Sequence, residues 1–151
     1  MKNRIYLDDI RTPLEQDWII VRNAEDFSKK IQEIGLENIS HISLDHDLDK
    51  SAMDEYFNNV AKNYTIDYSK IIEPTGLDCV KWIVDYFYKM NPKRRKMSRF
   101  EKKSYPIKFP YITIHSHNPI GSANMQGYLN NLDKNEGQEE DCVRGKIPYK
   151  D

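Results

Sequence analysis

The stretch HISLDHDLDK, residues 41–50, joins a short apolar run to a dense cluster of ionisable side chains. Its first four residues have the composition of a buried strand, and Asp45, His46, Asp47 and Asp49 follow directly. Carboxylates this close repel one another, so water, a cation or a cationic group must compensate for their charge. The stretch therefore predicts a strand that leaves the core at a charged site.

Three other apolar runs have the length and the β-branched or aromatic content of strands: residues 4–7, 18–21 and 111–115. Apolar residues at helical spacing predict helices at residues 24–35, 75–90 and 122–132. Asn23 and Thr75 are suited to cap two of these helices, and Gly35 to end one. Strands that alternate with helices predict an α/β fold, a three-layer α/β/α sandwich with a mainly parallel sheet of four to five strands and helices on both faces.

Polar clusters follow three of the four predicted strands. They are Asp8–Asp9, Asp45–Asp47 and His115–Asn118. The carboxyl ends of parallel strands lie at one edge of the sheet, and ligands bind beyond that edge. A single acidic strand end would be explained by a turn or a helix cap, but three clusters at one edge predict a functional site.

Asp8, Asp9, Asp45 and Asp47 are hard oxygen donors, which suit Mg²⁺ or Mn²⁺, and such an ion would relieve their mutual repulsion. Side chains alternate along a strand, so Asp45 and Asp47 are expected to face the same way. A histidine beside such a site has three possible roles: a softer ligand, which favours Mn²⁺, Fe²⁺ or Zn²⁺, a general acid or base, or a surface or core histidine with satisfied hydrogen bonds. The sequence leaves these roles open.

The stretch HNPIGSANM, residues 117–125, adds a second kind of binding group. Asn118 and the proline after it predict a turn, Gly121 frees the backbone, and Ser122 is suited to cap the next helix. A helix N-terminus with free N–H groups attracts anions. Carboxylates on one side of a cleft and an anion site on the other indicate a phosphate ester as the ligand.

One domain is expected over residues 1–132, with two additions inside it and a tail after it. Residues 50–73 are long for a connection and carry apolar residues at helical spacing, which predicts an inserted helix, either a lid over the site or a patch on the core. The basic loop at residues 91–106 is interpreted as a solvated linker in preference to a phosphate-binding patch. Residues 133–151 are expected to form an acidic C-terminal tail.

The 151 residues carry a formal net charge of −1, which gives no bulk field toward nucleic acid or a membrane surface. Cys79 and Cys142 are too few to staple a secreted domain, so a reducing compartment is expected. The chain runs into its first strand without an apolar leader, and no run reaches the roughly 18 apolar residues of a membrane span. A soluble cytoplasmic protein without a membrane partner is expected, and its oligomeric state is left open.

Five motifs together resemble the cyclic-phosphate processing receiver family, a divergent branch of the receiver, or response-regulator, fold. The motifs are LDDIRTP at 7–13, WIIVRNAEDF at 18–27, ISLDHDL at 42–48, TGLDCVKWI at 75–83 and ITIHSHNPIGSANM at 112–125. They follow the order of that family and cover most of the chain from residue 4 to about residue 132. The resemblance implies an incomplete receiver, flavodoxin-like topology with an acidic pocket at the strand ends.

The resemblance also carries individual residues of the family over to this chain. The matching positions are Arg11, His46, His115, Asn118 and Asn124. The sequence departs from the family pattern at Ala123, where the family often has Arg, and at His117, where a small or amide residue is more usual. Both departures concern the groups that would contact a phosphate.

The favoured hypothesis is a metal-dependent phosphoesterase that hydrolyses a cyclic phosphate or cyclic nucleotide, including a cyclic RNA end. The expected metal ligands are Asp8, Asp9 and Asp45, the expected catalytic groups are His115, His46 and Asp47, and the expected substrate-binding groups are Arg11, His117, Asn118, Ser122 and Asn124. The resemblance implies a setting in RNA or nucleotide processing or in phage–host conflict. Two alternatives stay open: a non-catalytic protein that sequesters a cyclic nucleotide, and a signalling receiver with Asp45 as the phosphoacceptor.

Overall fold

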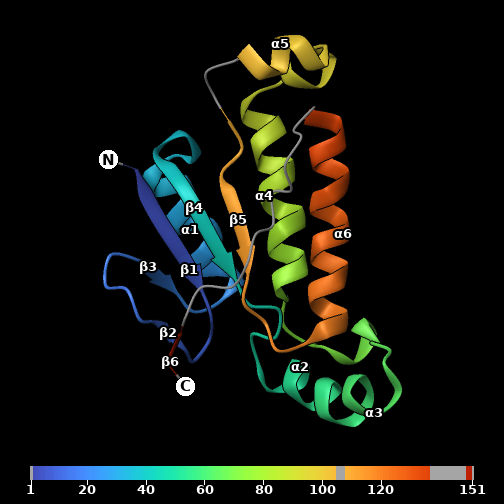
Figure 1. Ribbon diagram of the computed structural model, residues 1–151. Coiled ribbons are helices and arrows are strands. Elements are labelled where there is room, and N and C mark those ends of the chain that lie inside the picture. Colours follow the sequence, from blue (N-terminus) through green and yellow to red (C-terminus); the bar gives the residue numbers. More distant parts are fainter. Residues whose placement is uncertain (1, 105–107, 137–148, 151) are drawn as a thin grey trace.

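A four-stranded parallel sheet with strand order β3-β1-β4-β5 forms the centre of the protein. The computed structural model describes residues 2–104, 108–136 and 149–150 (Figure 1). The strands are β1 (Asn3–Leu7), β3 (Ile19–Val21), β4 (Ile39–Leu44) and β5 (Tyr111–Ile114). Leu7 is level with Val21 on one side and Leu44 on the other, and Leu44 is level with Ile114. The strands therefore end together at one edge, as the sequence predicted.

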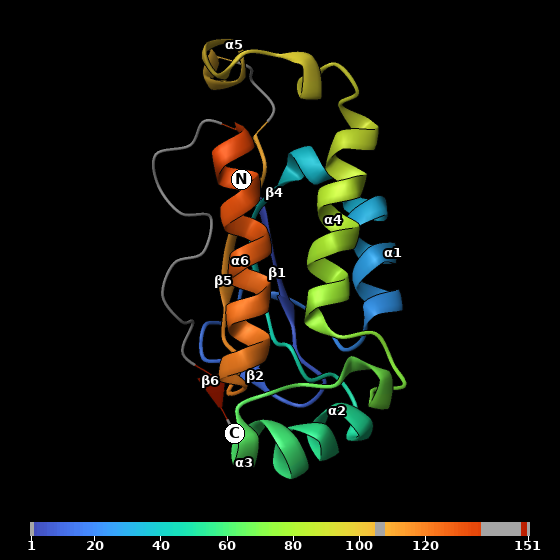
Figure 2. The same cartoon turned by 90° about the vertical axis from the view of Figure 1, so that its right-hand side faces the viewer.

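Three long helices pack side by side on one face of this sheet, with α4 between α1 and α6 (Figures 1 and 2). They are α1 (Ala24–Ile34), α4 (Gly76–Met90) and α6 (Pro119–Glu136). Alternate strand residues such as Ile5, Ile42 and Ile112 point into the core beneath them and are fully buried. Burying one such side chain contributes about 1.5–3 kcal/mol, so this face provides most of the hydrophobic stabilisation.

The other face of the sheet has a different composition. The alternate residues Tyr6, Ser43 and Thr113 lie level with one another and are buried there, with Trp18 against Tyr6. Among the described residues no helix covers this face. The α/β class and the parallel sheet are thus confirmed, whereas the described helices of the expected three-layer sandwich form one layer only.

The connection from β1 to β3 explains this arrangement. It is short and contains β2 (Thr12–Pro13), which pairs antiparallel with β6 (Tyr149–Lys150). Pro13 lacks a backbone N–H group and disfavours a helical conformation at the residue before it. A loop therefore stands where a complete receiver-like topology would place a helix on the second face.

The helix ends follow the capping signals of the sequence. The Asn23 side chain accepts a hydrogen bond from the backbone N–H of Asp26 at 2.8 Å, and Gly35 ends α1 with φ of 88°, a conformation that favours glycine. The backbone N–H of Thr75 donates to the Asp78 carboxylate at 2.8 Å at the start of α4. The predicted boundaries of α1 and α4 are confirmed.

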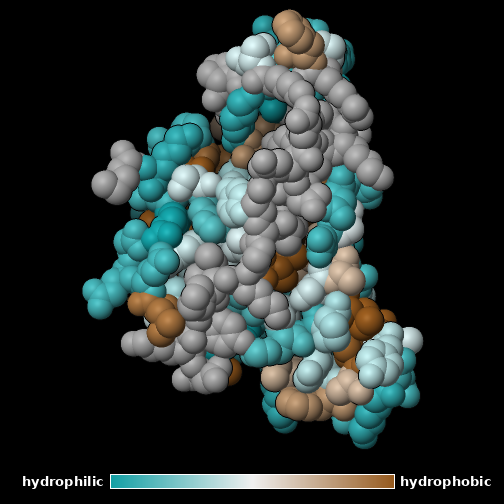
Figure 3. All heavy atoms as spheres, viewed as in Figure 1, coloured by the Kyte–Doolittle hydropathy of each residue, from teal (hydrophilic) through white to brown (hydrophobic). Residues whose placement is uncertain are grey.

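The insertion folds into a lobe below the carboxyl ends of the strands (Figure 1). It contains α2 (Lys50–Glu55), a π-helical turn η2 (Tyr56–Val60), α3 (Ala61–Asn63) and a 3₁₀ turn η3 (Tyr68–Lys70). The buried carboxylate of Glu55 accepts hydrogen bonds from the Asn59 side chain and the Asp67 backbone, which closes the lobe on itself. Hydrophobic and hydrophilic residues are mixed on its surface (Figure 3). The predicted inserted helix is confirmed.

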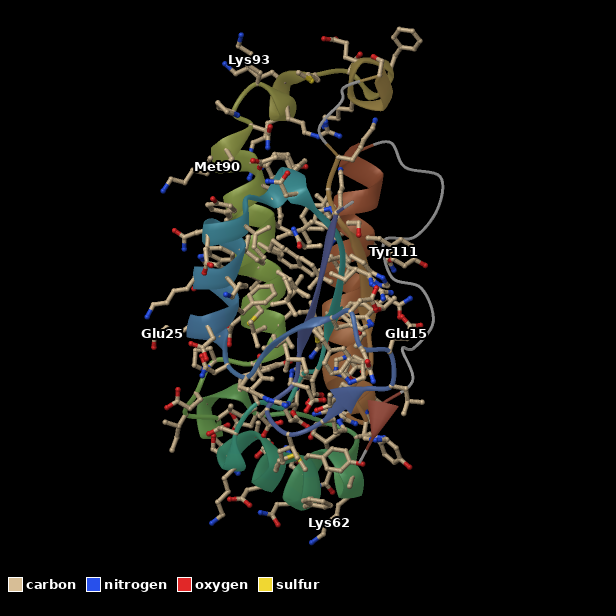
Figure 4. The ribbon with its side chains drawn as sticks, turned by 90° about the vertical axis from the view of Figure 1, so that its left-hand side faces the viewer. Glu15, Glu25, Lys62, Met90, Lys93 and Tyr111 are labelled. Atoms are coloured by element: carbon tan, nitrogen blue, oxygen red, sulfur yellow. The ribbon has the colours of Figure 1, made fainter. Side chains whose placement is uncertain are left out.

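The basic segment lies at the opposite end of the molecule. Figure 4 shows Lys93 at one end and Lys62, on α3, at the other. The segment forms η4 (Arg94–Lys96) and α5 (Arg99–Ser104), and the guanidinium group of Arg94 is buried 5.3 Å from the centre of the Phe87 ring. Part of the expected solvated linker is therefore packed against α4. In the described part of the chain no helix has both the length and the apolar character needed to cross a membrane.

Candidate functional site

The first residue after each of β1, β4 and β5 carries a site side chain. The backbone N–H of Asp45 donates to the carbonyl of Leu7, and that of His115 donates to the carbonyl of Leu44, so the sheet ladder continues one step past the strands. Asp8, Asp45 and His115 follow the alternation of the face opposite the helices. The expected convergence of the three strand ends is confirmed.

Asp8 is the most heavily bonded carboxylate of the site. Its Oδ1 accepts the backbone N–H groups of Ile10 and Arg11, and its Oδ2 accepts Arg11 Nε at 2.7 Å and His115 Nε2 at 3.0 Å. Burial raises the pKa of Asp8, but the hydrogen bonds from His115, Arg11 and Ile10 and the charge of Arg11 outweigh it and hold the pKa well below its usual range. These contacts favour the ionised form of Asp8.

Asp45 and Asp9 are less well compensated. Arg11 Nη2 lies 3.2 Å from Asp45 Oδ1, and the backbone N–H of His46 donates to the same oxygen at 2.8 Å. Burial and the charge of Asp8 nevertheless raise the pKa of Asp45 to about 7, and the same two causes raise the pKa of Asp9. The charge of Arg11 lowers the pKa of both carboxyl groups but does not outweigh burial and the charge of Asp8.

Asp8, Asp9 and Asp45 form the candidate metal site. One carboxylate oxygen from each lies within 4.8 Å of the others. Three oxygen donors with surplus negative charge fit the ligand preference of Mg²⁺ and Mn²⁺, and a bound cation would favour the ionised form of Asp45. The residues that the sequence assigned to a metal are brought together, with Arg11 paired to two of them.

His115 is fully buried behind Asp8. Its Nε2–H donates to Asp8, its Nδ1 lies 2.8 Å from the Ser43 hydroxyl, and its ring stacks on Tyr6 with a centroid separation of 4.2 Å. Burial lowers the pKa of His115, which the hydrogen bond to Asp8 partly opposes. The imidazole is held by both nitrogens. Sequence reasoning missed Ser43 and Tyr6, although strand alternation places each two residues before a site aspartate.

A second buried network holds Asp47. His46 Nδ1 lies 2.7 Å from Asp47 Oδ1, and the side-chain amide of Asn118 donates to the same carboxylate at 3.2 Å. The ring of His46 lies against the backbone of Gly121, where a Cβ atom would come within 2.4 Å of the His46 Cγ. Asp47 is thus oriented by β4, by the loop after β5 and by the start of α6.

The start of α6 differs from the expectation. The helix begins at Pro119, three residues before Ser122, and Asn118 is its cap. The Asn118 side-chain oxygen accepts the N–H of Gly121 at 2.9 Å, and its backbone carbonyl accepts the N–H of Ser122. The prediction of Ser122 as the cap was wrong, because the side chain of Asn118 reaches the first turn. Two N–H groups of the expected anion site are engaged within the protein.

A cavity of about 190 Å³ lies between the strand ends and the inserted lobe. It is lined by Asp9, Ile10, Arg11, Asp45, Asp47, Met53, Tyr56, Ser116 and His117. The lobe therefore contributes Met53 and Tyr56 to the lining, and its role as a lid stays a prediction. Sequence reasoning did not name Ile10 and Ser116 as site residues. Both lie inside the quoted motifs, just after predicted strands, so the argument that strand ends meet at one edge could have identified them.

The other candidate residues lie outside this lining. Four of them form hydrogen bonds to lining residues or to one another, as described above: Asp8, His46, His115 and Asn118. Asn124 donates its side-chain amide to the Tyr68 hydroxyl at 3.0 Å, and Ser122 lies in the first turn of α6. The structure thus brings together the metal and carboxylate candidates with Arg11 and His117, and leaves Ser122 and Asn124 at its periphery.

A parallel sheet whose carboxyl edge carries a cluster of aspartates, with Asp45 after the central strand β4, defines a receiver-like α/β protein. The sequence matches the family model of the cyclic-phosphate processing receiver domain over residues 3–131. The chain belongs to this family. Searches of curated proteins and of solved structures find no match. The family match includes the four strands of the main sheet, α1, α4 and the inserted lobe.

Proposed function

We propose that this protein is a metal-dependent phosphoesterase that opens the ring of a cyclic phosphate, carried by a nucleotide or an RNA end. The observation that carries the proposal is the set of three carboxylates within 4.8 Å of one another, at a cavity that Arg11 and His117 also line. Membership of a family named for cyclic-phosphate processing supports the same ligand class. We place the activity in the cytoplasm, in nucleotide or RNA processing or in phage–host conflict.

Asp8, Asp9 and Asp45 would hold the ion, Mg²⁺ or Mn²⁺. When bound, a divalent cation supplies Lewis-acid polarisation of a phosphoryl oxygen and makes water a better nucleophile. The raised pKa of Asp45, caused by burial and by Asp8, supports this assignment because a cation would relieve both effects. Arg11 would remain beside the carboxylates and face the non-bridging oxygens of the phosphate.

The reaction needs one proton acceptor and one proton donor. The oxygen of a water bonds to phosphorus, one ring P–O bond breaks, and the departing oxygen takes a proton, so the product is a phosphomonoester with a free hydroxyl. Asp47 lines the cavity and is suited to accept the proton of the water. His117 is exposed, lines the same cavity and is suited to protonate the departing oxygen.

This assignment changes the role expected for two histidines. The sequence favoured His115 or His46 as the proton donor. Both rings are fully buried, and each has hydrogen-bond partners at both nitrogens. We therefore assign them to positioning: His115 orients Asp8, and His46 orients Asp47.

The test is turnover of a panel of cyclic phosphates: nucleoside 2′,3′-cyclic and 3′,5′-cyclic monophosphates, a cyclic dinucleotide and an RNA with a 2′,3′-cyclic end. Each is incubated with Mn²⁺, with Mg²⁺ or with EDTA and followed by ³¹P NMR. We expect ring opening that requires the metal, falls at least about 100-fold in Asp45→Asn and falls about 10- to 100-fold in His117→Ala. Asp54→Asn, an exposed carboxylate on α2, is the matched control and should keep full activity.

A non-catalytic binder is the second candidate, and Arg11 favours it. Its ion pairs with Asp8 and Asp45 neutralise part of the cluster without any metal. A shifted ³¹P resonance without turnover in every metal arm would support sequestration and contradict the phosphoesterase. The receiver hypothesis has less support, because the described cavity lining includes no lysine to pair with a phosphorylated Asp45. Labelling of Asp45 by acetyl phosphate, without binding or turnover of any cyclic phosphate, would favour it.

A further inference from the structure

Tyr68 connects the inserted lobe to the site through hydrogen bonds to residues that do not themselves line the cavity. It lies in η3, 22 residues after His46, and its hydroxyl is 3.0 Å from His46 Nε2. The same hydroxyl is 3.0 Å from the side-chain nitrogen of Asn124, on the second turn of α6. Three segments that are distant in sequence thus meet at one phenolic oxygen.

The hydrogen bonds of this network have one consistent direction. A carboxylate only accepts, so His46 Nδ1 carries the proton that is donated to Asp47 at 2.7 Å. In a neutral imidazole Nε2 then accepts, and the single phenolic proton of Tyr68 is its donor. The Tyr68 oxygen in turn accepts from the amide nitrogen of Asn124. Asn124, Tyr68, His46 and Asp47 form a single ordered chain.

The surroundings hold this chain in place. His46 is fully buried, and the backbone of Gly121 lies against its ring. The Tyr68 ring meets the His46 ring edge to face, with centroids 5.7 Å apart. Asp47, at the other end, is also held by Asn118 and lines the cavity. The position of the lobe on α6 is therefore connected to the orientation of a carboxylate in the site.

We propose that Tyr68 is a positioning residue, which fixes His46 as the Nδ1–H tautomer and thereby orients the Asp47 carboxylate in the cavity. A neutral histidine held in one tautomer donates to Asp47 from a fixed direction, as the partners behind a ligand or a catalytic base commonly do. The consequence for catalysis rests on the proposed function. The tautomer of His46 does not, and it can be observed without any substrate.

The test uses the full chain with ¹⁵N-labelled histidine and long-range ¹H–¹⁵N correlation at mildly alkaline pH, with His46→Asn to assign the His46 signals. We expect the Nδ1–H tautomer in the unaltered protein. Tyr68→Phe keeps the ring and removes the hydroxyl, so the tautomers should mix, which moves the Nε2 signal upfield and the Nδ1 signal downfield, toward each other. Tyr64→Phe, an exposed phenol of the same lobe, is the matched control and should leave the His46 signals unchanged.

Two results would overturn the inference: an Nε2–H tautomer or a doubly protonated His46 in the unaltered protein, or His46 signals that are identical in Tyr68→Phe. A substrate found with the panel above gives a second readout, in which Tyr68→Phe should lower kcat about 10-fold with little change in KM. An equal loss in Tyr64→Phe would contradict the positioning role. Absence of any turnover would contradict the phosphoesterase proposal and leave the tautomer result as the test of Tyr68.

Discussion

Arg11 decides the charge balance of the site at the scale of single residues. Its Nε pairs with Asp8 and its Nη2 with Asp45, so one guanidinium spans two buried carboxylates. The sequence indicated that the aspartates need a compensating charge and placed Arg11 nearby. It could not show that Arg11 bridges two strand ends, because the bridge depends on the path of the loop after β1. The compensation is partial, since the pKa of Asp45 stays raised by burial and by Asp8.

Arg11→Gln should make the protein dependent on a divalent cation for stability. Removing the guanidinium leaves the buried carboxylates of Asp8 and Asp45 close together without its positive charge, which should cost about 3 kcal/mol in EDTA. Mg²⁺ or Mn²⁺ should restore more of the thermal stability in Arg11→Gln than it adds to the unaltered protein. Differential scanning calorimetry with and without metal measures both effects.

The matched control for this prediction is Lys29→Gln. Lys29 pairs with Glu25 at 2.7 Å, the same distance as the pair between Arg11 and Asp8, but on the exposed surface of α1. Water and salt screen an exposed ion pair, so Lys29→Gln should change the melting temperature little and show no response to metal. A melting temperature of Arg11→Gln that does not respond to either metal would contradict the cation site.

At the scale of elements, most boundaries were predicted correctly, whereas the start of α6 was predicted three residues too late. Caps at Asn23 and Thr75 are local signals, and the structure confirms them. The sequence analysis predicts a turn at Asn118 and a cap at Ser122, but proline is favoured at the first position of a helix, a signal that points to Asn118 as the cap. The partner of Tyr68 was beyond prediction, because it depends on how the lobe packs against α6.

Gly121→Ala should damage the site, although alanine normally favours a helix. A Cβ atom at this position would come within 2.4 Å of the His46 ring, which is held by Asp47 and Tyr68 and has little freedom to move. We expect a loss of about 1–3 kcal/mol in unfolding free energy and a disturbed His46 signal in the NMR experiment. Urea unfolding followed by circular dichroism measures the loss.

Gly127→Ala is the comparison within the same helix. Nothing lies within 4 Å of a Cβ atom at Gly127, so the higher helix propensity of alanine should stabilise the protein by about 0.5–1 kcal/mol. If the two substitutions change the unfolding free energy with opposite signs, the loss at Gly121 is caused by contact with His46 and not by helix propensity. Stabilisation by Gly121→Ala would show that His46 is not held as tightly as its hydrogen bonds indicate.

For the whole molecule, the sequence predicted the α/β class and the convergence of strand ends, but not the number of helical layers. The units β3-α1-β4 and β4-α4-β5 cross the sheet in the same direction, so right-handed crossovers place both helices on one face. A helix on the other face would have to come from the connection between β1 and β3. That connection holds Pro13 and the short strand β2 instead. Strand order, which the sequence does not state, was needed for this step.

The dependence of stability on pH is a property of the whole molecule, because it is the sum of the contributions of all groups whose pKa differs between the folded and the unfolded chain. Burial and the charge of Arg4 lower the pKa of His41 from 6.5 to about 4, so between these values the unfolded chain binds more protons and stability falls as pH falls. Burial and Asp8 raise the pKa of Asp45 from 3.8 to about 7, so the native state binds more protons there and stability falls as pH rises. The two contributions oppose each other in nearly the same range.

Relative to the unaltered protein, two substitutions should therefore change the dependence of stability on pH in opposite directions, in EDTA between about pH 4 and pH 7, the range set by these shifts. Asp45→Asn leaves the His41 contribution, so stability should fall as the solution is acidified. His41→Gln leaves the Asp45 contribution and the opposing contribution of His115, whose pKa burial also lowers, so on acidification this variant should gain stability relative to the unaltered protein. Each substitution should change the unfolding free energy by roughly 1–2 kcal/mol across this range. This value is reduced because solvent screens the partly exposed His41. Urea unfolding across this pH range measures both, and Mg²⁺ or Mn²⁺ should make the unaltered protein resemble Asp45→Asn, because a bound cation keeps Asp45 ionised. Parallel slopes in the two variants would contradict the assigned signs.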